Sequence, residues 1–213
     1  MSSPSLPAHW PARTAKDIEI ILLHEAAQAT VCHALGWAVT GMRFTAQGGV
    51  VDWHRTTTLN KIETLEDLMK RICIHMSGKI AEEQLLKSNN TGSETDINRI
   101  SEEMEKIVEN GMLPGLPKWN ITSGYHGPKL LAEYEKAKRA LLQECKKRTE
   151  RIVIEQKDVI EDLAKKFGAS TELNEEQVQN FFAANSPRHS PSGGAKPLQS
   201  AAPTSNAAST SET

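Results

Sequence analysis

The sequence is poor in aromatic residues and in cysteine. Aromatic side chains make up 5% of the 213 residues, charged residues make up 24%, and the only cysteines are Cys32, Cys73 and Cys145. Three widely separated cysteines do not form a disulfide framework, and free thiols are typical of a reducing compartment. We therefore expect a cytoplasmic protein. The composition favours a helix-rich domain over a β-sandwich or barrel.

The chain also lacks an excess of either charge and a long apolar run. It carries 25 basic and 27 acidic residues, for a net charge of −2. This balance gives no electrostatic reason to expect binding to nucleic acid or to an acidic membrane. Residues 18–23 form the longest apolar stretch near the N-terminus, far short of the roughly 20 residues that cross a bilayer. Residues 1–11 resemble no signal peptide, so we expect neither a leader nor a membrane segment.

Nucleotide-binding motifs are missing as well. The sequence contains no P-loop pattern and no dinucleotide-binding glycine pattern, so we do not expect ATP to bind to this chain. Residues 186–213 consist mainly of Ser, Pro, Ala, Gly, Thr and Asn and have few apolar side chains to offset the entropy of ordering. We expect a flexible segment over residues 1–16, one domain over residues 17–185 and a disordered tail over residues 186–213.

Apolar residues recur at helical spacing through most of that domain. Helices are predicted over residues 17–35, 64–86, 93–111, 129–167 with a break near 155–157, and 174–182. Two short apolar runs, residues 42–46 and 50–53, flank Gly48-Gly49 and predict a β-hairpin. The fold class expected is therefore mainly α, with a small hairpin.

One pentapeptide in the first predicted helix points to chemistry. His24-Glu25-Ala26-Ala27-Gln28 matches the zinc-protease pattern H-E-x-x-H except at its last position. In that pattern the two imidazoles lie on one helical face and bind zinc, and the Glu activates the attacking water. Taken alone the match is weak, because His followed by Glu often arises by chance.

Further segments strengthen the match. Gly78-Lys79-Ile80-Ala81-Glu82-Glu83, then Thr91-Gly92-Ser93-Glu94-Thr95-Asp96, then a helix ending in Gly111-Met112, follow the pentapeptide in this order. Together they make the chain resemble the peptidase domain of the FtsH-type zinc metallopeptidases (family M41) over residues 17–182. The resemblance implies a helical metallopeptidase fold with a bound Zn²⁺.

The resemblance also implies a role for each matched residue. His24 is implied as a zinc ligand, Glu25 as the general base and Asp96 as a distant third ligand, while the second ligand falls on Gln28. A different interpretation of Asp96 remains open, because Ser93 and Asp96 have the spacing of a helix N-cap box. Glu82 is equally compatible with a solvated helix face and with a structural role beside the site.

Gln28 is the main departure from the family pattern. An amide offers only a neutral carbonyl oxygen, which binds zinc less firmly than an imidazole nitrogen. His33 cannot replace it, because nine residues along a helix turn through about 900° and place His33 opposite His24. His75 lies where the family usually has an apolar residue. It is either a displaced ligand or a partly buried structural histidine.

Two functions follow from these observations. The first is a metal-dependent endopeptidase in which Glu25 activates a zinc-bound water. The second is a catalytically inactive peptidase-like domain that binds polypeptides or a partner protease or ATPase. Familiar members of the family join the peptidase domain to an ATPase that unfolds substrates. Without one, we expect either cleavage of unfolded or flexible polypeptides only, or an ATPase that acts from a separate chain. The resemblance separately implies a homo-oligomer.

Overall fold

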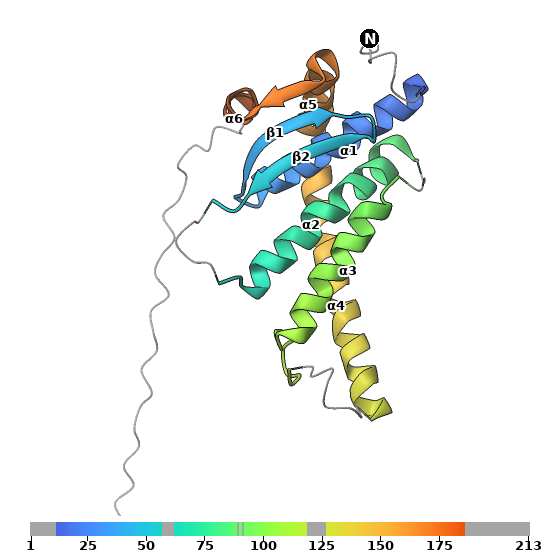
Figure 1. The fold of residues 1–213 in the computed structure, drawn as a ribbon, viewed down its shortest axis with the longest axis vertical. Coiled ribbons are helices and arrows are strands. Elements are labelled where there is room, and N and C mark those ends of the chain that lie inside the picture. The colour runs from blue at the N-terminus through green and yellow to red at the C-terminus, as the bar shows by residue number, and fades with distance from the viewer. Residues whose placement is uncertain (1–11, 57–61, 89, 91, 119–126, 186–213) are drawn as a thin grey trace, which may run out of the picture.

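A computed structural model describes residues 12–56, 62–88, 90, 92–118 and 127–185. The expectations for residues 1–11 and 186–213 lie outside these ranges. The predicted fold class is confirmed, because the described chain is mainly helical with a small antiparallel sheet (Figure 1). No helix in the described ranges has the length and apolar character that crossing a bilayer requires. The elements in chain order are α1 (Ala15–Ala34), β1 (Ala38–Phe44), β2 (Gly49–His54), α2 (Leu65–Ala81), the π-helical turn η1 (Glu82–Leu86), α3 (Glu94–Glu109), α4 (Pro128–Glu155), α5 (Lys157–Ser170), β3 (Glu172–Asn174) and α6 (Glu175–Asn185).

Helix α1 is the centre of the domain. It contacts α2 and α5 as well as strands β1 and β2, so its middle is covered on several sides (Figure 1). Eleven residues of α1 are buried, including the whole stretch from Leu23 to Cys32. A Thr14–Asp17 capping box starts the helix, and Gly36 follows its end with φ of +80°. The pentapeptide therefore lies in the interior of the domain.

The sheet has the strand order β2-β1-β3, and both pairings are antiparallel. β1 and β2 form the predicted hairpin, and Val39 and Met42 on β1 are almost completely buried. β3 was not predicted: it has three residues, of which Leu173 pairs with Met42. It precedes α6, so the last helix begins at Glu175.

Helices α2, α3 and α4 extend together away from the sheet, with both α3 and α4 packed against α2 (Figure 1). The predicted break in the last long helical region is confirmed, because α4 ends at Glu155 and α5 begins at Lys157. The three cysteines are free and buried. Cys73 and Cys145 lie between α2 and α4, where the Cys73 thiol donates to the Cys145 carbonyl oxygen over 3.6 Å.

Candidate metal centre

His24 and Gln28 lie one helical turn apart on α1 and face the same way. The Gln28 Nε2 atom is 3.0 Å from the His24 Nε2 atom, and both side chains are buried. The spacing of the pentapeptide thus brings positions 24 and 28 together, as the H-E-x-x-H pattern requires. The second position presents an amide instead of an imidazole.

Glu82 fixes the other side of the His24 ring. Its Oε1 atom is 2.6 Å from His24 Nδ1, and its Oε2 atom accepts a hydrogen bond from Asn90 Nδ2 over 2.6 Å. Glu82 opens the π-helical turn η1 directly after α2 and is only 1% exposed. Local π-helical turns within helices are frequent at functional sites. A carboxylate on the second nitrogen of a histidine orients the ring in many metal sites.

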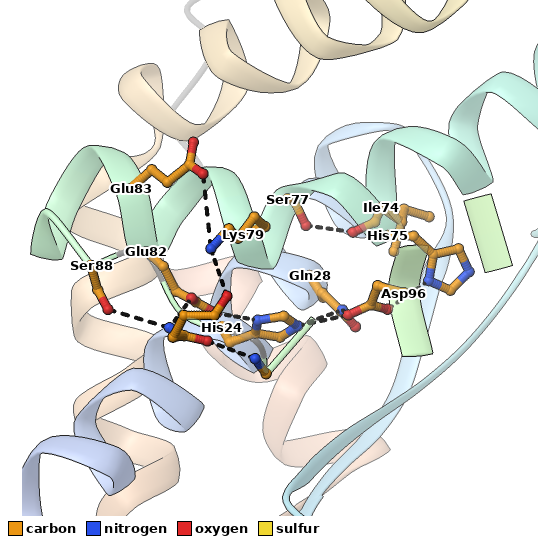
Figure 2. Close-up of polar contacts among 12 residues, drawn as sticks. His24, Gln28, Ile74, His75, Ser77, Lys79, Glu82, Glu83, Ser88 and Asp96 are labelled. Atoms are coloured by element: carbon orange, nitrogen blue, oxygen red, sulfur yellow. Dashed lines mark hydrogen bonds and ion pairs between the residues drawn. The ribbon is translucent and has the colours of Figure 1, made fainter. Parts of the chain in front are cut away.

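Asp96 approaches from the first turn of α3. Its Oδ2 atom is 3.0 Å from His24 Nε2 and accepts a hydrogen bond from Gln28 Nε2 over 3.1 Å. Its Oδ1 atom is 3.0 Å from His75 Nδ1. Figure 2 shows Asp96 between the two histidines. Because Ser93 makes no side-chain capping hydrogen bond, the N-cap box interpretation of Asp96 is wrong, and the carboxylate is turned into the site.

The hydrogen bonds around His24 control its charge. Burial disfavours a charged ring, but the bonds to Asp96 and Glu82 outweigh burial and raise the pKa of His24 to about 10. In the protonated ring, Nδ1–H donates to Glu82 and Nε2–H donates to Asp96. Burial also opposes ionisation of Asp96, yet hydrogen bonds from His24 and His75 hold its pKa well below the usual range. The metal-free centre is therefore an imidazolium between two carboxylates.

Glu25 lies beside this centre with a different character. It is 7% exposed, and no described residue donates a hydrogen bond to its carboxylate. Burial raises the pKa of Glu25 to about 7; the charge of His24 opposes this rise, and those of Asp96 and Glu82 add to it. A carboxyl group with a pKa near neutrality is suited to take up and release protons.

Two glycines make room for these side chains. A Cβ atom added at Gly78 would lie 2.4 Å from the His24 ring, and one added at Gly49 would lie 2.1 Å from Glu25 Cγ. Gly78 opens the second motif segment of the sequence, and the structure identifies the His24 ring as its neighbour. The role of Gly49 had no signal in the sequence beyond its place in the predicted turn.

The residues present fit a metal ion with a weakened donor set. Among the described residues, no group of three His, Cys, Asp or Glu side chains is arranged to hold one. His24 Nε2, Asp96 Oδ2 and the Gln28 amide nevertheless lie 3.0 to 3.1 Å from one another. Donor atoms of tetrahedral zinc, with bonds of about 2.0–2.1 Å, lie about 3.3 Å apart. Rotation of the Gln28 amide by 180° would turn its carbonyl oxygen toward the other two donors.

The remaining sequence candidates separate clearly. His33 stacks on Phe182 with ring centroids 4.1 Å apart, so it packs against α6 and is not part of the centre. Glu83 is exposed, and its carboxylate lies 3.9 Å from Lys79 Nζ. His75 contacts Asp96. The sequence had suggested either a displaced metal ligand or a structural histidine, and it gave no sign of this contact. Asn90 had no sequence signal, because its contact with Glu82 depends on η1.

No family model and no curated protein matches this chain. The FtsH-type resemblance therefore depends on the spaced motifs, and function is inferred from the geometry around His24.

Proposed function

We propose that this chain is a metal-dependent endopeptidase domain of the FtsH type, which hydrolyses peptide bonds in unfolded or flexible polypeptides. The observation that supports it best is the convergence of His24 Nε2, Asp96 Oδ2 and the Gln28 amide within 3.0 to 3.1 Å of one another. His24 and Gln28 come from α1 and Asp96 comes from α3, 72 and 68 positions further along the sequence. They are the residues that the family motifs indicate.

In this proposal each buried group has one task. A zinc ion held by His24, Asp96 and Gln28 would polarise the peptide carbonyl and lower the pKa of a water molecule. Glu82 holds His24 Nδ1, so that Nε2 faces Asp96 and Gln28. Glu25 takes the proton of the attacking water and passes it to the leaving amine. Its pKa of about 7 suits both transfers.

The sheet offers a binding place for the polypeptide. β2 is an edge strand in the order β2-β1-β3, and within the described ranges no strand pairs with its outer side. Its first residue, Gly49, lies against Glu25. An extended polypeptide added to this edge by backbone hydrogen bonds would pass the general base. We assign the substrate to this edge.

Gln28 sets the weakness of the site. Zinc must displace the proton that Asp96 and Glu82 stabilise on His24, so metal affinity falls as the pH is lowered. The amide oxygen compensates less for this cost than an imidazole would. We therefore expect activity to require zinc in excess over the protein.

Cleavage of casein tests the proposal. We expect proteolysis by the zinc-loaded protein, inhibition by a chelator, and a loss of about 10²- to 10⁴-fold in rate in Glu25→Gln. Glu19→Gln on α1 is the control, because Glu19 is exposed and pairs with Lys16 rather than with any residue of the site. Protein with stoichiometric zinc but no cleavage would refute the proposal.

One observation favours a second function. Gln28 Nε2 and His24 Nε2–H both donate to Asp96 Oδ2, over 3.1 and 3.0 Å, so hydrogen bonds alone can hold the centre together. A catalytically inactive domain that binds polypeptides, or a partner protease or ATPase, would need no metal. It predicts that chelation changes neither the melting temperature nor polypeptide binding, whereas the peptidase predicts a change in the melting temperature.

A further inference from the structure

His75 lies behind Asp96, on the side away from His24. It is 5% exposed on α2, and its Nδ1 atom is 3.0 Å from Asp96 Oδ1 (Figure 2). Its ring centroid lies 5.8 Å from that of Trp53 on β2. One carboxylate thus has its two oxygens engaged by two different histidines. The position of the His75 ring is set by its place on α2 and by its contact with Trp53 on β2, independently of Asp96.

Asp96 needs such a partner because its own helix does not hold it. An acidic residue in the third position of a helix usually bonds back to the N-cap residue, but no capping hydrogen bond forms at Ser93. With a hydrocarbon side chain at position 75, Oδ1 of Asp96, whose side chain is only 15% exposed, would lose its hydrogen-bond donor. The carboxylate could then rotate away from His24.

We propose that His75 is a positioning residue of the centre. Its Nδ1–H group holds Asp96 Oδ1, so that only Oδ2 is presented to His24 and Gln28. The part of this role that concerns metal rests on the proposed function, whereas the orientation of Asp96 does not. In this arrangement His75 is neither a metal ligand nor a general base.

Nuclear magnetic resonance of the metal-free protein tests the orientation. In protein labelled with ¹⁵N-histidine, His24 Nδ1–H reports the bond to Glu82 and Nε2–H reports the bond to Asp96. His75→Phe keeps the ring against Trp53 but removes the donor. We expect the His24 Nε2–H resonance to shift or broaden while the Nδ1–H resonance stays. His75→Asn, which retains an N–H group near the Nδ1 position, should restore the parent signal.

Zinc affinity is the second readout. In the Gln28→His protein, His75→Phe should weaken zinc binding by about 10- to 100-fold, the usual effect of removing a group that orients a ligand, and His75→Asn should not. His75→Leu repeats both comparisons if the Phe ring prevents folding. Unchanged His24 resonances in folded His75→Phe and His75→Leu would overturn the inference. Absence of zinc binding in every variant would contradict the peptidase proposal instead, and the resonances would still decide the role of His75.

Discussion

At the scale of single residues, the centre is organised by what surrounds His24. Glu82 and Asp96 hold its two ring nitrogens, and the backbone of Gly78 passes close to its face. Each contact restricts the ring in a different direction. The imidazole is therefore fixed before any ligand binds, which is the arrangement that efficient metal and catalytic sites require.

The first prediction concerns Glu82. Glu82→Gln replaces the acceptor of His24 Nδ1 with an amide whose N–H₂ group conflicts with the Asn90 donor. We expect zinc affinity to fall by about 10- to 100-fold, measured by competition with a chromophoric chelator. Glu83→Gln is the matched control, because Glu83 is the exposed neighbour. An equal loss in both variants would contradict the role given to Glu82.

The second prediction concerns Gly78. In Gly78→Ala the new Cβ atom would lie 2.4 Å from the His24 ring, so the ring must move away. We expect a loss of about 1–3 kcal/mol in the free energy of unfolding, measured by urea denaturation, together with loss of zinc binding. Gly41→Ala is the control, since its added carbon would meet neighbours only at 3.5 Å or more. A stable Gly78→Ala protein with unchanged zinc binding would show that the packing tolerates a side chain there.

At the scale of elements, local sequence signals predict the long helices, whereas β3 and η1 depend on contacts with segments that are distant in sequence. Apolar spacing and capping residues give the positions of α1, α2 and α3 to within a few residues. β3 escaped prediction because three residues carry too little pattern and gain their strand geometry by pairing with β1. The π-helical turn η1 escaped for a similar reason, since Glu82 and the residues after it fit a continuous helical stripe.

The third prediction concerns the start of α2. Asp67 accepts hydrogen bonds from the Thr64 backbone and hydroxyl and from Arg55. Burial alone would raise the pKa of Asp67, but these bonds lower it below the ordinary value of 3.8. The stabilisation is therefore complete above that value and is lost as the pH falls through the lowered pKa.

We accordingly expect Asp67→Asn to reduce the free energy of unfolding by about 1–2 kcal/mol at neutral pH. The difference from the parent protein should shrink as the pH falls below 3.8. Chemical denaturation at several pH values measures it. Asp158→Asn, in the first turn of α5, is the control and should change stability little. A difference that does not vary with pH would argue against the charged capping box.

At the scale of the whole molecule, the domain is assembled around α1, and the centre lies where α1, α2 and α3 meet. The sequence identified His24, Glu25, Gln28 and Asp96 through motifs, and the structure brings three of them into direct contact. The sequence did not predict the contact between His75 and Asp96, because that contact depends on how α2 and α3 pack. An ATPase partner and a homo-oligomer remain proposals from the family resemblance.

The fourth prediction uses the interior thiols. Cys32, Cys73 and Cys145 are each 0% exposed, and burial raises the pKa of Cys32 to about 12. We expect Ellman's reagent to react with none of them at an appreciable rate in the native protein and with all three after denaturation. Immediate reaction in the native state would contradict the packing of α1 and of the α2–α4 interface.

The equilibrium affinity for zinc tests the central claim most directly, that Gln28 leaves a complete but weak metal centre. Parent protein and Gln28→His would be titrated side by side against a chromophoric chelator at neutral pH. We expect measurable zinc binding by the parent protein and binding at least about tenfold tighter, or about 1.4 kcal/mol, by Gln28→His. Equal affinities, or no binding by either folded protein, would contradict it.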